Sequence, residues 1–181
     1  MKISRRHFTK IIGITGSLGA FFVSSCKRFF DTGKPEYAIT DEQLETLRQV
    51  HEHLFPQNET SPGASSINSV GYVQKVLLDP QVEDYEKRLI LYGIFWTEET
   101  SKKLFSKPFT LLSKLQKEDV VKNLVSYDKG ESWISNNISY IIESLLSDPI
   151  YGGNTNSSGW KWLKHQPGYP RPDELHKYPY L

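Results

Sequence analysis

The chain has 181 residues, with 22 basic and 21 acidic side chains and a formal net charge of +1. Residues 1–25 contain four of the basic residues and no acidic one, so the remainder has 18 against 21, which excludes the strongly basic face of a nucleic-acid-binding protein. The single cysteine excludes an internal disulfide, a cysteine-ligated metal or iron–sulfur site and a CxxCH haem attachment.

The first 25 residues show the order of features of a bacterial export signal peptide. The stretch "SRRHFTK" places Arg5, Arg6 and Phe8 ahead of an apolar run from Ile11 to Val23, which is the pattern of a twin-arginine signal. As a helix this run would cover about 20 Å, short of the hydrocarbon core of a bilayer, so a permanent transmembrane helix is the weaker interpretation. We therefore expect the twin-arginine translocase to export the chain.

The apolar run ends in "VSSC", which resembles a lipobox. In such a motif the cysteine becomes the first residue of the mature protein and is acylated, so we predict a lipid on Cys26 that attaches the protein to a membrane on the periplasmic side. An ordinary cleavage site with a chance cysteine, or a buried thiol, is the alternative. Residues 26–39 are predicted to form a tether, because Gly33 and Pro35 interrupt any periodicity.

The centre of the chain contains two helix starts with the same signature. Thr40 followed by Gln43, and Ser113 followed by Gln116, have the spacing of a capping box. Apolar residues at helical spacing follow each of them, and Pro56 is expected to close the first helix.

Apolar residues at helical spacing predict three further helices. One follows the loop "NETSPGASS" and carries Ile67, the next spans about 82–105, and the last begins near Ser132 and ends before Pro149. No stretch alternates with period two for long enough to predict a strand. We therefore predict an all-α single domain of about five helices over residues 40–170, with a tail at 171–181.

The histidines, carboxylates and aromatic residues of these helices each have a structural interpretation. His51 and His53 point to different sides of one helix, so we interpret them as solvated or singly hydrogen-bonded rather than as metal ligands. Glu98 and Glu99 also diverge and are expected on a solvated face. One aromatic set is predicted to be core rather than a sugar-stacking platform: Tyr85, Tyr92, Phe95 and Trp96.

The C-terminal segment from residue 149 is irregular and rich in Gly, Pro, Asn and aromatic residues. Large amphipathic rings such as those of Trp160 and Trp162 are typical of protein interfaces. The same residues would also suit a segment that packs over its own helical domain. The two interpretations are compatible, and both stay open.

This segment resembles the C-terminal signature of the gluconate 2-dehydrogenase subunit 3 family, through "DPIYGGN" followed shortly by "GW" and "PGYP". The twin-arginine signal, "SPGASS" ahead of the second helix and a helix over residues 116–124 occur in the same order. The signature residues that we expect to define the fold or to contact a partner are Tyr151, Gly152, Gly153, Asn154, Gly159, Trp160 and Pro167.

The resemblance implies a small accessory subunit without a cofactor, metal or catalytic residue of its own. FAD is expected in a large flavoprotein partner that oxidises sugars or sugar acids, and a cytochrome c subunit often receives the electrons in such complexes. The small subunit would carry the export signal for the folded flavoprotein and help to anchor it. The alternative is a free-standing envelope lipoprotein that binds carbohydrate through its aromatic residues.

Overall fold

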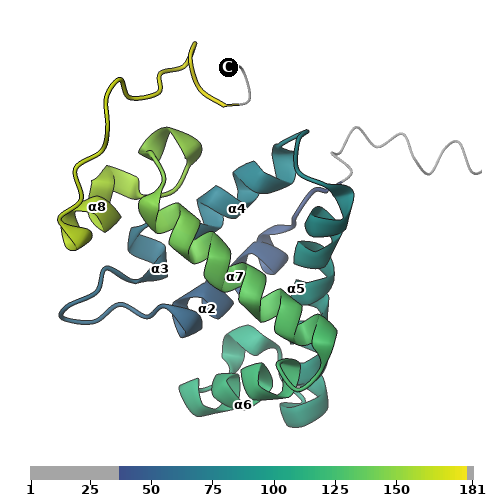
Figure 1. Cartoon of the computed structure of the whole chain (residues 1–181). Coiled ribbons are helices and arrows are strands. Elements are labelled where there is room, and N and C mark those ends of the chain that lie inside the picture. Colours follow the sequence, from purple (N-terminus) through teal and green to yellow (C-terminus); the bar gives the residue numbers. More distant parts are fainter. Residues whose placement is uncertain (1–36, 179–181) are drawn as a thin grey trace, which may run out of the picture. The chain divides into compact units, whose positions relative to one another are not determined.

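The computed structural model describes residues 37–178 as a set of packed helices (Figure 1). The predicted signal and lipidation residues Arg5, Arg6, Phe8 and Cys26 lie outside the described residues. Within the described range there is no strand, so the predicted all-α fold is confirmed. The elements are α2 (Asp41–Leu54), α3 (Gly63–Ser66), α4 (Ser69–Leu78), α5 (Asp84–Phe105), η1 (Phe109–Leu111), α6 (Lys114–Leu124), α7 (Asp128–Leu146), η2 (Pro149–Tyr151), η3 (Thr155–Ser157) and α8 (Ser158–Leu163).

Both predicted capping boxes are present. The hydroxyl of Thr40 accepts from the backbone N–H of Gln43 at 3.2 Å, and the Gln43 side chain accepts from the Thr40 N–H at 2.9 Å. Ser113 and Gln116 make the same reciprocal pair at the start of α6, at 3.3 and 3.0 Å. The first turns of α2 and α6 are therefore fixed by local sequence.

Two element boundaries differ from the prediction. The stretch expected as a loop ahead of α4 contains the single turn of α3, and α4 begins only after Asn68, which has left-handed backbone angles. Helix α7 begins at Asp128 rather than near Ser132. Gly130 lies in the first turn of this helix, and a Cβ there would lie 2.1 Å from the Leu124 carbonyl oxygen. The glycine therefore lets the start of α7 pass close to the end of α6.

Helix α7 is the central element, with contacts to α2, α4, α5, α6 and α8 (Figure 1). Its Trp133 is fully buried and donates from Nε1 to the Thr97 hydroxyl at 3.2 Å. The indole lies directly against Gly93 of α5, where an added Cβ would be 2.1 Å from the ring. The close approach of α5 and α7 therefore depends on a residue without a side chain at position 93.

The prediction that the aromatic set of α5 belongs to the core is wrong for three of its four members, and only Trp96 packs against the core. Tyr85, Tyr92 and Phe95 are 69%, 55% and 56% exposed, and Trp96 is partly buried with its ring stacked on Tyr92 at 6.1 Å. A different side of α5 faces inward, and it includes Gly93, against which the Trp133 ring lies. The buried residues of α5 are Lys87, Leu89, Ile90, Gly93, Ile94, Thr97, Thr100 and Ser101.

Candidate functional site

The signature segment closes the C-terminal end of α7. The last carbonyl groups of a helix have no partner within the helix and must find donors elsewhere. The Asn154 side-chain amide donates to the Ser147 carbonyl oxygen at 2.9 Å, and Trp160 Nε1 donates to the Leu146 carbonyl oxygen at 2.8 Å. Two signature side chains therefore satisfy two of the terminal carbonyls of the central helix.

Asn154 makes several of the hydrogen bonds of this closure. It is fully buried and its backbone is left-handed, with φ of 47°, a conformation that asparagine adopts more readily than most residues. Its side-chain oxygen accepts from the Gly159 N–H at 2.8 Å, and its carbonyl oxygen accepts from the Ser157 N–H at 2.8 Å. One residue thus links the end of α7 to the start of α8.

Three signature glycines lie where the backbone is tightly packed. A Cβ on Gly153 would be 2.8 Å from the Ser144 carbonyl oxygen, and a Cβ on Gly159 would be 2.3 Å from that of Leu145. Gly152 ends η2 with φ of 91°, and its carbonyl oxygen accepts from the Asn68 side chain at 2.8 Å. These glycines let the signature segment lie against both α7 and the start of α4.

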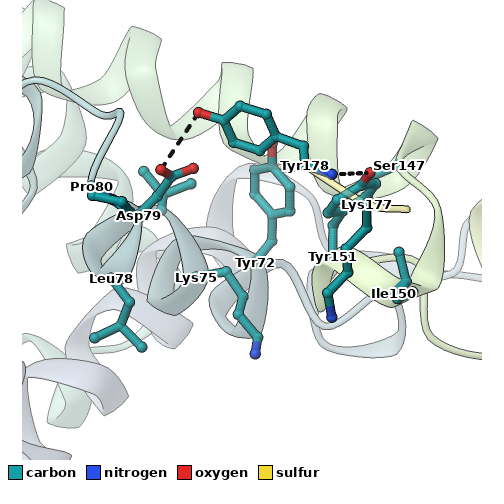
Figure 2. A pocket seen from close by; sticks show the side chains of 11 residues that line it. Tyr72, Lys75, Leu78, Asp79, Pro80, Ser147, Ile150, Tyr151, Lys177 and Tyr178 are labelled. Carbon is teal, nitrogen blue, oxygen red and sulfur yellow. Dashed lines mark hydrogen bonds between the residues drawn. The ribbon is translucent and has the colours of Figure 1, made fainter. Parts of the chain in front are cut away.

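Tyr151 faces a groove of about 510 Å³ between α4, η2 and the C-terminal segment (Figure 2). The backbone N–H of Tyr178 donates to the Tyr151 hydroxyl at 3.3 Å, and the Tyr178 hydroxyl donates to Asp79 Oδ1 at 3.5 Å. Both bonds are long, so they hold the C-terminal segment over the groove only weakly. The lining residues are Tyr72, Lys75, Val76, Leu78, Asp79, Pro80, Ser147, Ile150, Tyr151, Lys177 and Tyr178.

Tyr72, which lines the groove, acts as a hydrogen-bond donor and keeps its proton near pH 7. Tyr72 donates to Glu143 Oε2 at 3.0 Å, and burial together with this carboxylate raises the pKa of Tyr72. Tyr140, which donates to Glu86 Oε1 at 2.6 Å, has a raised pKa for the same two reasons. The groove therefore combines apolar walls with tyrosine hydroxyls, the amines of Lys75 and Lys177 and the carboxylate of Asp79.

Signature residues Trp160 and Pro167 border a second, shallower hollow of about 440 Å³. The Arg171 guanidinium lies 5.0 Å from the centre of the Trp160 ring and donates from Nε to Asp148 Oδ2 at 2.8 Å. Burial is the largest single influence on Asp148 and by itself would raise its pKa. The hydrogen bond and charge of Arg171 and the hydrogen bond from the Ile150 N–H together outweigh burial, so the pKa lies below its usual range.

His51 contradicts the expectation of a solvated or singly hydrogen-bonded histidine. It is fully buried and makes two hydrogen bonds: Nδ1 lies 2.7 Å from the Ser69 hydroxyl oxygen, and Nε2 lies 2.8 Å from Asn137 Oδ1. The Asn137 amide donates to the Trp133 carbonyl oxygen at 2.7 Å, so its Oδ1 is the acceptor and His51 carries its proton on Nε2. Nδ1 then accepts from the Ser69 hydroxyl.

This Ser69–His51–Asn137 arrangement resembles a catalytic triad in residue type but not in access. Burial lowers the pKa of His51 to about 4, although Asn137 opposes the shift, so the imidazole is neutral near pH 7. The adjoining cavity, of about 50 Å³, has room for no more than a water molecule or two. The arrangement therefore joins α2, α4 and α7 through a buried polar network, a role that sequence reasoning missed because the three residues are far apart in the chain.

His53, Glu98 and Glu99 are the remaining candidate residues of the central helices. His53 makes a single bond from Nε2 to Glu118 at 2.9 Å, in line with the expectation for that residue. Glu98 is not on a solvated face: its carboxylate accepts from the Thr46 hydroxyl at 2.8 Å and from the Phe109 N–H at 3.2 Å. Glu99 is exposed, as expected. Glu98 thus ties α5 to α2 and η1.

Residues 37–178 contain neither a metal-binding cluster nor a membrane-spanning helix. No group of three or more His, Cys, Asp or Glu side chains in this range is arranged to hold a metal ion. None of its helices combines the length and the apolar character needed to cross a membrane.

Comparison with families of known proteins gives one match. Residues 41–168 match the family described as gluconate 2-dehydrogenase subunit 3, so the match runs from the first residue of α2 into the "PGYP" of the signature segment. No curated protein and no solved structure matches the chain.

Proposed function

Because the chain belongs to the gluconate 2-dehydrogenase subunit 3 family, we propose that it is the non-catalytic small subunit of a flavin-dependent dehydrogenase complex that oxidises sugars or sugar acids. The observation that carries this proposal is the extent of the match, which includes every helix of the described domain and the signature that closes α7. FAD belongs to the large subunit in this proposal, and a cytochrome c subunit accepts the electrons.

In this proposal the N-terminal segment directs the export of the bound flavoprotein together with its own chain. The twin-arginine route carries proteins that are already folded, often around a cofactor, and Arg5, Arg6 and Phe8 form its address. A flavoprotein loaded with FAD in the cytoplasm needs this route but can use the signal of a bound partner. The acylated Cys26 then keeps the pair on the periplasmic side of a membrane.

We assign the contact with the flavoprotein to the groove beside Tyr151. The groove is largely apolar, it includes a signature residue, and Tyr178 of the C-terminal segment covers it through two long hydrogen bonds. A partner side chain that enters the groove would displace Tyr178 and leave the closure of α7 by Asn154 intact.

The test is to follow the flavoprotein rather than the small subunit. In cells in which Arg5 and Arg6 are both replaced by Lys, the flavoprotein is expected to accumulate in the cytoplasm, whereas Lys10→Arg, which alters a neighbouring basic residue, leaves its export unchanged. Purification of the native small subunit is expected to yield a yellow complex with bound FAD. Normal export of the flavoprotein in the double-Lys strain contradicts the escort role.

One structural finding favours the alternative of a carbohydrate-binding lipoprotein. The exposed rings of Tyr85, Tyr92 and Phe95 on α5 present the flat aromatic surface on which sugars stack. A colourless protein that is retained on a sugar affinity matrix, and that loses retention in Tyr92→Ala, would support this function instead.

A further inference from the structure

The surface around α8 combines exposed apolar side chains with exposed basic ones. Its side chains from Lys161 to Gln166 are all exposed, and α8 lies at the edge of the helical bundle (Figure 1). Trp162 and Leu163 are 42% and 43% exposed although they are apolar. Two large, partly exposed apolar residues therefore lie between two exposed lysines in the sequence of α8 and its C-cap.

The charge of this surface is positive. The sequence has no acidic residue between Pro149 and Pro172, and the adjoining hollow is lined by Lys161, Lys164, His165 and Arg171 with no carboxylate among its lining residues. Arg171 is paired with Asp148, but Lys161 and Lys164 make no ion pair among residues 37–178. Two ammonium groups are therefore available, on a chain that is weakly acidic once its signal peptide is removed.

Trp162 of this surface contacts Phe55, the C-cap residue of α2. The two rings lie 5.9 Å apart in a tilted arrangement, so the indole is supported on one side and open on the other. Further along the chain, Tyr169 is 86% exposed. Tryptophan and tyrosine beside lysine are the residues that are enriched where a protein meets the interface of a lipid bilayer.

We propose that Lys161, Trp162, Leu163 and Lys164 form a membrane-contacting surface that binds anionic phospholipid headgroups. The lysines would lie against the lipid phosphates, while Trp162 and Leu163 enter the headgroup region. Because binding of this kind depends on negative lipid, it is stronger on anionic than on neutral bilayers and weakens with salt.

The other exposed aromatic face does not fit an anionic surface. Tyr85 at the start of α5 is flanked in the sequence by Glu83, Asp84 and Glu86, whose carboxylates would be repelled by lipid phosphates. Charge thus distinguishes the two aromatic surfaces, and only the α8 surface is complementary to an anionic membrane.

The predicted tether does not determine which face of the domain lies against the membrane, so contacts such as these can determine it. The residues from Cys26 to Glu36 can extend to at most about 40 Å, which is close to the diameter expected for a domain of this size. A lipid on Cys26 would therefore keep the domain near the bilayer without fixing its orientation. The inference rests on the proposed function only for this proximity.

The test measures binding of the chain from residue 26 onward, with Cys26→Ser so that no acyl chain contributes. The probes are vesicles of equal parts phosphatidylglycerol and phosphatidylcholine, compared with pure phosphatidylcholine, in a co-sedimentation assay. The protein is expected to bind the anionic vesicles, and the double variant K161E/K164E to bind them about tenfold more weakly. The matched control K102E/K103E, which reverses two exposed lysines of α5, is expected to bind within about twofold of the parent.

Vesicles with brominated acyl chains give a second readout, because bromine quenches the fluorescence of an inserted tryptophan. Quenching is expected in the parent and is expected to fall in Trp162→Phe. Unchanged vesicle binding by K161E/K164E, equal losses in K102E/K103E, or no binding by the parent would each overturn the proposal. So would a K161E/K164E variant that loses the flavoprotein but keeps the vesicles. Neither vesicle readout involves the flavoprotein or an acyl chain on Cys26, so failure of the proposed function would be seen separately.

Discussion

The side-chain amide of Asn154 donates to the carbonyl oxygen of Ser147 at 2.9 Å, while its side-chain oxygen accepts from a backbone N–H on the other side. This buried amide both donates and accepts a hydrogen bond. A carboxylate of the same shape cannot replace it, because an ionised carboxylate only accepts hydrogen bonds. This single side chain therefore joins the end of the central helix to the segment that follows it.

Replacement of Asn154 by Asp is expected to lower the free energy of unfolding by about 2–3 kcal/mol. The carboxylate can still accept from Gly159, but it faces the Ser147 carbonyl without a hydrogen to donate. Asn156→Asp is the matched control, because Asn156 is also left-handed but is exposed. Urea denaturation compares the two, and equal losses would show that the amide bond to Ser147 contributes nothing.

The buried His51 predicts a stability that depends on pH in the mildly acidic range. Its pKa falls from the ordinary 6.5 to about 4 in the folded protein, so between these values the unfolded chain binds the extra proton. The stability that the neutral imidazole confers is therefore fully present above the pKa of the unfolded chain. As the pH is lowered from there to the pKa of the folded protein, the free energy of unfolding decreases by about 1.4 kcal/mol per pH unit. Subtracting the profile of His51→Gln isolates this slope from the titration of carboxylates. A difference profile that is flat across the interval between the two pKa values would contradict the assignment.

Gly93→Ala is expected to destabilise the fold by about 2–3 kcal/mol, because the new methyl group would overlap the Trp133 ring. Gly168→Ala provides the control for the change in chain flexibility, since a Cβ at Gly168 would meet no other part of the described chain within 4 Å. Thermal or urea unfolding, followed through tryptophan fluorescence, reports both. If Gly93→Ala matches Gly168→Ala, then α5 and α7 can separate at low cost.

Tyr151→Ala is expected to reduce the amount of flavoprotein that co-purifies with the small subunit, because it removes one wall of the groove to which we assign the partner. The change should leave the closure of α7 in place, since Asn154 and Trp160 carry it. Tyr85→Ala serves as the matched control at an exposed tyrosine outside the groove. Full retention of the flavoprotein by Tyr151→Ala would move the contact elsewhere on the domain.

The parts of the fold that could be predicted from the sequence are those that local chemistry decides. The Thr40–Gln43 and Ser113–Gln116 boxes specify helix starts within four residues of chain, and both are present. The outward side of α5 was not predictable in this way, because apolar and aromatic residues occur around much of its circumference. The requirement for Gly93 on the inward side comes from Trp133, which lies on a helix far along the chain.

The candidate site divides in the same way. The sequence resemblance singles out Asn154 and Trp160, but their role at the end of α7 depends on bonds that only coordinates reveal. The prediction for His51 was wrong because its partners, Ser69 and Asn137, are 18 and 86 positions away. Composition and spacing carry no information about such a distant pair.

The tight packing at Gly93, Gly153 and Gly159 also limits which sequences can adopt this fold. Any side chain at these positions would meet a ring or a carbonyl oxygen at less than 3 Å, so drift during evolution must either keep glycine there or shift a whole helix. Retention of all three glycines is therefore a stringent criterion for recognising distant homologues whose remaining residues have diverged.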